Sequence, residues 1–232
     1  MASVDSMKAV ISLTSWRERI ATVGLTIFSI LTHCPGFHVV LCLSSDEFPQ
    51  KEAGLPRDLA VMAANNIIEI LWVKENYKAF KKVLFTMKKY HDVPVISADD
   101  DLIYCKNYAD VLYDKWQEMP TSCIGLSSTH FSISDNFGEA SLWGYAQLFP
   151  PGFHRHFDFS ILDTIRKLGC IDDDGFYTEV RKRFHISAYS FQLPFNNEYI
   201  AGNTNASQEN CITTLRRTHA QNDREIFRKL LQ

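Results

Sequence analysis

The chain has 232 residues, of which 46% are hydrophobic and 22% are charged, and this is enough for one globular domain with a sizeable core. Such a composition excludes disorder for most of the chain. The 27 acidic and 24 basic residues give a net charge of −3, so no positive field covers the whole protein, and we expect no nucleic-acid partner.

The first half of the chain alternates short apolar runs with amphipathic segments. Parallel strands need crossover connections, which helices supply, so this alternation predicts a mostly parallel α/β sheet flanked by helices. The predicted strands are 8–14, 37–43, 67–73 and 93–98, and the predicted helices are 18–32, 57–64 and 78–90.

The second half is less regular. A helix at 107–118 and a strand at 121–126 are followed by residues 127–157, which are rich in aromatics, glycine and serine. This stretch shows no sustained period, and we expect an irregular segment that binds a ligand. The remaining predicted elements are helices at 159–168 and 176–184, a strand at 185–191 and a terminal helix at 223–231.

Cysteine usage and the N-terminal sequence bear on the compartment. The six cysteines form no CxxC motif and lie mostly in apolar runs, so we expect reduced thiols. The first residues lack the apolar core and cleavage site of a signal peptide. No stretch approaches the roughly 18 consecutive apolar residues that a membrane span needs. We therefore expect a cytoplasmic protein.

Three consecutive carboxylates, Asp99, Asp100 and Asp101, follow the predicted strand 93–98. In open α/β sheets, ligands bind at the carboxyl ends of the strands. Adjacent like charges repel, and a hard cation such as Mg²⁺ or Mn²⁺ would neutralise them while leaving coordination positions for phosphate. The alternative is a solvated turn in which one aspartate caps the next helix.

Four segments, VISLTSWRERIATVGLTIFSIL, SSDEFP, YKAFKKVLFTMKKY and VISADDDLIY, resemble in order and spacing the GT-A-type glycosyltransferases of bacterial capsule and lipopolysaccharide genes. The resemblance runs over nearly the whole chain and is more specific in the first half. It implies a GT-A-like single domain over 1–232. In that domain, about 8–126 would form the nucleotide-binding half and about 127–232 the acceptor-binding half.

The resemblance also implies a donor and a cofactor. Such enzymes bind a nucleotide-sugar at the end of the parallel sheet, and their DxD motif holds Mn²⁺ or Mg²⁺ against the diphosphate. This gives the metal to Asp101, with Asp99 directed toward the ribose or the metal. Asp100 takes the variable middle position beside the nucleotide.

Further nucleotide contacts come from the first strand end and from a lysine-rich segment. The resemblance places Thr14, Ser15 and Arg19 at the nucleotide and Lys81 near the phosphates. From the residues alone, Arg19 fits a solvated helix position equally well. Lys81 likewise fits an ordinary basic helix face.

A second acidic run, Asp172-Asp173-Asp174, precedes Gly175 and two aromatics. In the resembling family, two acids followed by aromatics supply the base that deprotonates the acceptor hydroxyl in an inverting transfer. This implies Asp174 as the base, with Asp173 as the alternative, because Gly175 stands where the family tends to have a larger apolar residue. The same acids can also cap the helix 176–184.

Aromatic and histidine candidates complete the predicted site. Trp143 and Tyr145 lie in the segment WGYAQLFPPG, which resembles the family's glycine, aromatics and double proline, and they are candidate acceptor or donor contacts. Both also fit a core position. A late histidine completes the metal shell in some enzymes of this fold, so His185 or His219 is a further candidate.

The terminal helix 223–231 is basic and amphipathic. It either packs on its own domain or docks peripherally at a membrane that carries a lipid-linked acceptor.

The expected function is metal-dependent transfer of a sugar from a UDP-sugar to a glycan or lipid-linked glycan, with inversion. The expected place is the cytoplasm or the inner face of the membrane, in polysaccharide biosynthesis. The rival readings are a non-catalytic binding or scaffold module of the same fold and, less favoured, a haloacid-dehalogenase-type phosphohydrolase, which also carries a DxD motif.

Overall fold

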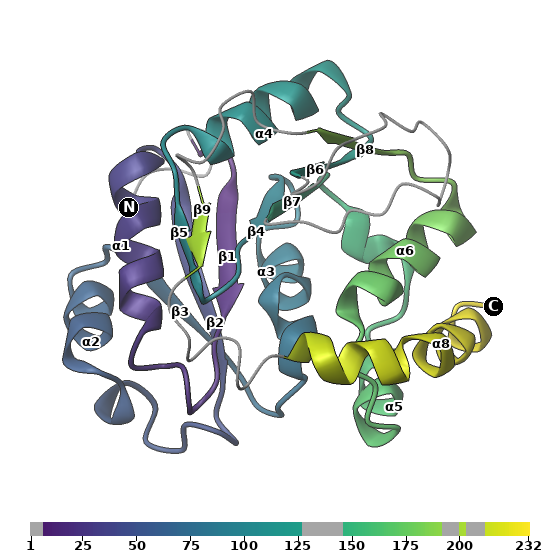
Figure 1. The fold of residues 1–232 in the computed structure, drawn as a ribbon, viewed down its shortest axis with the longest axis horizontal. Coiled ribbons are helices and arrows are strands. Elements are labelled where there is room, and N and C mark those ends of the chain that lie inside the picture. The colour runs from purple at the N-terminus through teal and green to yellow at the C-terminus, as the bar shows by residue number, and fades with distance from the viewer. Residues whose placement is uncertain (1–6, 127–145, 192–199, 203–211) are drawn as a thin grey trace.

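The computed structural model describes residues 7–126, 146–191, 200–202 and 212–232, which form a seven-stranded sheet between two layers of helices (Figure 1). The strand order is β3-β2-β1-β4-β7-β6-β8. The bounds of these strands are β1 Val10–Thr14, β2 His38–Ser44, β3 Glu69–Val73, β4 Val95–Ser97, β6 Cys123–Leu126, β7 Ala146–Phe149 and β8 Ala188–Phe191.

The sheet is mostly parallel, as the sequence predicts. Strands β3, β2, β1 and β4 run in parallel, and β6 is parallel to β8, whereas β7 is antiparallel to both β4 and β6. The carboxyl ends of the first four strands therefore meet at one edge. The loops that follow Thr14, Ser44, Val73 and Ser97 all leave the sheet at this edge.

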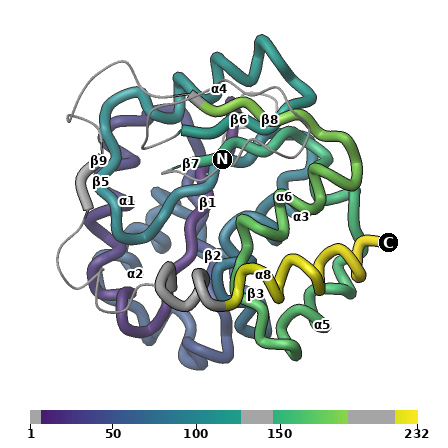
Figure 2. The backbone as a smooth tube through the Cα atoms, turned by 45° about the vertical axis from the view of Figure 1, so that its right-hand side comes forward, coloured from purple at the N-terminus to yellow at the C-terminus, as the bar shows by residue number. Residues whose placement is uncertain are grey.

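Alternation along the strands supplies two separate cores. In β1, Ile11 and Leu13 face one core, and Val10 faces the other. The first core lies under α1 Val23–His33, α2 Arg57–Ala64 and α4 Tyr108–Glu118, and the second under α3 Leu84–Lys89, α5 Ile161–Lys167, α6 Asp173–Phe184 and α8 Ile212–Leu230 (Figure 2).

Two predicted helices are shorter in the structure. The helix expected over 18–32 begins only at Val23, because successive turns at residues 17–22 come first, with the Ile20 amide bonded to the Trp16 carbonyl at 2.9 Å. The helix expected over 78–90 is divided into a 3₁₀ turn, η3 Lys78–Lys82, and α3. Val83, with φ at −122°, interrupts it.

The prediction of an irregular segment over 127–157 is wrong for the last part of that range. Residues Ala146–Phe149 form β7, which fills the middle of the sheet, and Phe153–His156 form a 3₁₀ turn, η4. Two further strands were not predicted: β5 Leu102–Tyr104 pairs with β9 Ile200–Gly202 in a separate ribbon. Strands of three or four residues are too short to display a period.

The two last helices begin earlier than predicted. α6 begins at Asp173 rather than at 176, and α8 begins at Ile212 rather than at 223. α8 packs on its own domain, because Phe227 is fully buried and its ring lies 6.1 Å from that of Phe80 and 5.4 Å from that of Phe176.

Two of the predictions from sequence concern membrane-spanning helices and the state of the cysteines. Within the described residues, no helix has the length and apolar character needed to cross a membrane. The five cysteines in this part of the chain are buried and free, as predicted.

Candidate active site

Asp100 is the fixed centre of the first acidic cluster. Its side chain accepts hydrogen bonds from Ser15 Oγ at 2.6 Å and from Arg19 Nη1 at 2.8 Å, and its carbonyl accepts from Thr26 Oγ1 at 3.0 Å. The residue is 7% exposed. Since both carboxylate oxygens already accept hydrogen bonds, Asp100 anchors the loop after β4 to the end of β1.

Asp99 and Asp101 flank this anchor and are more accessible, with 40% and 25% of their side chains exposed. Arg19 Nη1 lies 3.1 Å from Asp101 Oδ2, and Lys82 Nζ lies 2.8 Å from Asp99 Oδ1. Burial raises the pKa of Asp101, and the charge of Asp99 raises it further while Arg19 opposes the shift. Two carboxylates with a cation beside each therefore border the site.

Lys82 joins the two acidic clusters. Its ammonium group lies 2.8 Å from Asp99 and 3.9 Å from Oδ2 of Asp173, which is fully buried in the first turn of α6. The Ser12 hydroxyl donates to the Lys82 carbonyl and fixes the backbone there. The carboxylates that the sequence places more than seventy residues apart thus meet at one cation.

Two aspartates, Asp172 and Asp223, accept hydrogen bonds from backbone amides at the start of α6. Asp172 is the N-cap and accepts from the Gly175 amide at 3.0 Å, so the predicted capping role is confirmed for this residue. Asp223 of α8 accepts from the amides of Ile171 at 2.8 Å and Asp172 at 3.1 Å. Because these bonds fix the backbone, the Cα–Cβ bonds of Asp173 and Asp174 leave the helix in fixed directions.

Asp174 is half-buried and lies beside a strand of the central sheet. Its Oδ1 accepts from Gln147 Nε2 of β7 at 2.8 Å. Gln147 was not singled out from the sequence, because its segment gives no sign that the chain there enters the sheet. The fold alone brings β7 under the start of α6.

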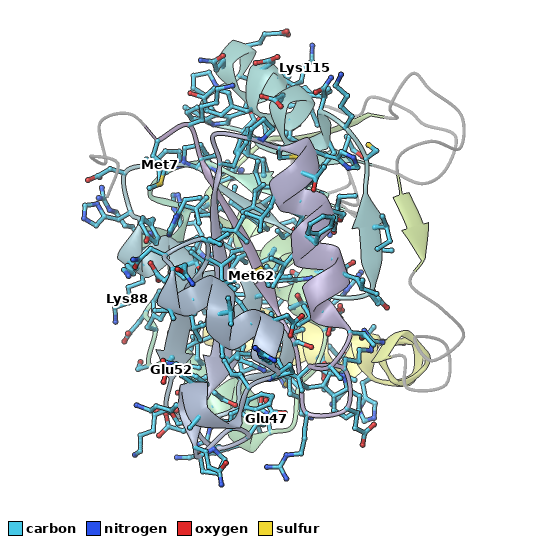
Figure 3. All side chains as sticks on the ribbon, turned by 90° about the vertical axis from the view of Figure 1, so that its left-hand side faces the viewer. Met7, Glu47, Glu52, Met62, Lys88 and Lys115 are labelled. Carbon is cyan, nitrogen blue, oxygen red and sulfur yellow. The ribbon has the colours of Figure 1, made fainter. Side chains whose placement is uncertain are left out.

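Lys81 is directed toward the loops after β2 and β3. It is 2% exposed, and its Nζ lies 3.3 Å from Glu47 Oε2 and 3.1 Å from Asn76 Oδ1. Burial lowers its pKa, with Glu47 opposing the shift. Figure 3 shows Glu47 at the end of the molecule opposite Lys115. Lys82, which the sequence did not single out, is the lysine that contacts the acidic clusters.

Thr14 joins two strand ends, and the two candidate histidines are exposed. The Thr14 hydroxyl donates to the Cys42 carbonyl at 2.7 Å and joins the ends of β1 and β2. His185 is the exposed C-cap of α6, about 18 Å along the helix from its acidic end. His219 is exposed on α8. Trp143 and Tyr145 lie outside the described residues.

The acids at the carboxyl edge of the sheet offer a divalent cation two protein ligands. Among the described residues, no group of three or more His, Cys, Asp or Glu side chains is arranged to hold a metal ion. Asp99 and Asp101 offer two carboxylates at the carboxyl edge of the sheet. Mg²⁺ commonly takes one or two protein carboxylates and completes its shell with phosphate and water, so this pair fits such an ion when a diphosphate is bound.

The mostly parallel sheet, with an antiparallel strand inserted beside β4 and with acids at its carboxyl edge, is an α/β fold of the GT-A-like type. Several solved structures share this fold. S. aureus TarS aligns with 93% of this chain at 11% identity and a TM-score of 0.55, and the chain spans 40% of the TarS chain.

Two further solved structures share the fold over nearly their whole length. The 4-diphosphocytidyl-2C-methyl-D-erythritol synthase aligns with 90% of this chain and 98% of its own, at 14% identity and a TM-score of 0.51. The CMP:2-keto-3-deoxy-manno-octonic acid synthetase complexed with CTP aligns with 92% and 99%, at 11% identity and a TM-score of 0.51. No protein-family model and no curated protein sequence matches the chain. These identities establish the fold alone.

Proposed function

We propose that this protein is a metal-dependent glycosyltransferase that moves a sugar from a UDP-sugar to a hydroxyl of a glycan or lipid-linked glycan, with inversion. The observation that carries the proposal is the meeting of both acidic clusters at Lys82, 2.8 Å from Asp99 and 3.9 Å from Asp173, at the carboxyl edge of the sheet. A TarS structure of the same fold contains UDP, at a TM-score of 0.53 and 12% identity. This similarity supports a nucleotide donor.

In this proposal the donor diphosphate binds beside Asp99 and Asp101, which hold Mn²⁺ or Mg²⁺. The ion, when bound, offsets the negative charge that develops on the leaving nucleotide. Arg19 and Lys82 already lie beside these acids and supply charge-assisted hydrogen bonds to the phosphates. Thr14 and Ser15, at the end of β1, border the nucleoside.

Asp174 is the proposed base. Asp173 is fully buried beside Lys82, whereas Asp174 is half-buried and therefore more accessible to an acceptor. The acceptor hydroxyl gives its proton to the carboxylate as its oxygen attacks the anomeric carbon, and the nucleoside diphosphate leaves from the opposite face. A single displacement of this kind inverts the anomeric configuration.

The test is a thermal-shift panel of UDP, UDP-sugars and CTP with and without Mn²⁺, followed by a transfer assay on the ligands that bind. Saturation at about 100 times Kd adds about 2.7 kcal/mol, or roughly 5 to 10 °C in Tm for a chain of this size. We expect UDP to stabilise the protein only with Mn²⁺, and Asp101→Asn to lose this shift. The matched control is Asp114→Asn, an exposed carboxylate of α4, which should keep it.

Three results would contradict the proposal. Equal stabilisation by UDP without metal would remove the metal from the mechanism. Binding of UDP and Mn²⁺ without transfer to any hydroxyl acceptor would favour the non-catalytic reading. Release of pyrophosphate from CTP would identify a nucleotidyltransferase instead.

A further inference from the structure

Gln147 occupies a position in the central sheet that connects both halves of the candidate site. It lies on β7 between β4 and β6, opposite Gly125, and its backbone amide donates to Ser97 Oγ at 3.0 Å. Ser97 is the last residue of β4, two residues before the first acidic cluster. The Gln147 side chain reaches the second cluster, since its Nε2 donates to Asp174 Oδ1.

The chemistry of the contact fixes the orientation of the amide. An ionised carboxylate only accepts hydrogen bonds, so the NH₂ end of Gln147 must face Asp174, and the carbonyl end must point elsewhere. Gln147 is 5% exposed, and its Oε1 is buried without a hydrogen-bond partner in the part of the chain that the structure describes. An apolar side chain of the same size would avoid this unsatisfied oxygen.

Small residues surround Gln147 in the sheet. The register aligns it with Ser12 and Ser97 on one side and with Gly125 and Ser190 on the other. Gln147 is the one long side chain in this row of five. A rigid strand therefore carries a single amide to the start of α6, at a cost in hydrogen bonding that packing alone does not explain.

We propose that Gln147 is a positioning residue for the base of the transfer, an inference that rests on the proposed function. The last torsion of an aspartate side chain is broad, so hydrogen bonds decide the orientation of its carboxylate. The hydrogen bond from Gln147 fixes that rotation from a strand that is paired on both sides. Asp174 thereby presents its carboxylate to the acceptor hydroxyl in one orientation, as a general base requires.

The test compares Gln147→Met, which keeps the size and loses the side-chain hydrogen bond to Asp174, with Gln147→Glu, which places a carboxylate against Asp174. We expect the Met variant to lower kcat by about 10- to 100-fold, as a small misplacement of a catalytic group does. KM for the donor, UDP affinity with Mn²⁺ and Tm should stay unchanged. The Glu variant should lose at least as much kcat, because two like charges then face each other.

The decisive experiment compares the double variant Gln147→Met/Asp174→Asn with Asp174→Asn alone. Once the base is gone, its positioning residue has nothing to act on, so the double variant should turn over at the rate of Asp174→Asn alone. Equal losses in both backgrounds would overturn the inference, as would a Met variant with kcat within twofold of wild type or a kcat loss matched by loss of fold.

The outcomes also separate this inference from the function on which it rests. If Asp174→Asn is inactive and Gln147→Met is fully active, only the positioning role fails. If the wild-type protein transfers no sugar, or if Asp174→Asn keeps full turnover, the proposed function and the positioning role fail together.

Discussion

A methyl group on Gly175 would lie 2.1 Å from Oδ2 of Asp172, so the first turn of α6 closes directly onto its own N-cap carboxylate. Arg224 of α8 lies 3.6 Å from the same oxygen. There is no room for a larger residue at this position while Asp172 caps the helix. The contact with Asp172 therefore explains why residue 175 is a glycine, where the resembling family tends to have a larger apolar residue.

Gly175→Ala should destabilise the protein by about 1 to 3 kcal/mol, because the new methyl group forces Asp172 off the cap. In an Asp172→Ala background the sign should reverse. There the clash is absent, and alanine has the better helix propensity by about 1 kcal/mol. Urea unfolding of the four proteins in this cycle measures both effects. Equal destabilisation in both backgrounds would show that the Asp172 contact is not the cause.

Lys82→Met should strengthen Mn²⁺ binding in the absence of nucleotide by roughly 3- to 10-fold. Lys82 Nζ lies 2.8 Å from Asp99 Oδ1 and competes with the ion for that oxygen, in a partly exposed pair worth about 1 kcal/mol. The same change should weaken UDP binding, since a cation for the phosphates is lost. Calorimetry with Mn²⁺ alone and then with UDP measures both constants.

The control for this experiment is Lys115→Met on α4, which removes an exposed lysine paired with Glu118. It should leave both constants unchanged. Weaker Mn²⁺ binding by Lys82→Met would mean that Asp99 does not hold the ion and that Lys82 supports the site in another way.

Asp174→Asn should reduce kcat by about 10²- to 10⁴-fold, the usual cost of removing a general base, while UDP and Mn²⁺ still bind. Asp173→Asn is the matched comparison in the same helix turn. It should affect stability more than Asp174→Asn does, because Asp173 is fully buried and lies 3.9 Å from Lys82. NMR of the product should show the anomeric configuration opposite to that of the donor. Retention, or loss of kcat only in Asp173→Asn, would overturn the assignment of the base.

The local sequence pattern predicts those parts of the fold in which strands and helices alternate regularly. The continuous apolar run at 37–43 predicts β2, and the alternation of strands and helices predicts the parallel sheet. It does not predict β7, since Ala146–Phe149 is a short strand whose partners, β4 and β6, lie elsewhere in the chain. Non-local pairing of this kind leaves little trace in the segment itself.

The candidate site likewise contains residues that the local sequence pattern identifies and residues that only the fold brings into place. The two acidic clusters are visible as consecutive carboxylates, and both lie where a loop or helix begins at the sheet. Lys82 and Gln147 are not visible in this way, because their roles depend on which neighbour the fold places beside them. Lys81 and Lys82 are adjacent in sequence, yet one is buried against Glu47 and the other reaches Asp99. Both lie in the 3₁₀ turn η3, where adjacent residues point about 120° apart.

Glu69 offers a test of stability that is remote from the proposed chemistry. It begins β3, at the opposite end of the strand from the carboxyl edge. Burial acts to raise its pKa, but hydrogen bonds from His38, Tyr90 and Lys89 outweigh this and hold the pKa at about 2. A folded-state pKa below the ordinary value of 4.5 means that the charged form stabilises the fold.

Glu69→Gln should therefore lower the free energy of unfolding by about 2 kcal/mol at pH 7. The stabilisation is complete above pH 4.5 and is lost as the pH falls toward 2, so the difference from wild type should shrink to about half at pH 3. Urea unfolding at the two pH values measures it, with Glu118→Gln, an exposed pair partner of Lys115, as the control. A difference that stays constant or grows on acidification would show that the Glu69 charge is not stabilised by these three partners.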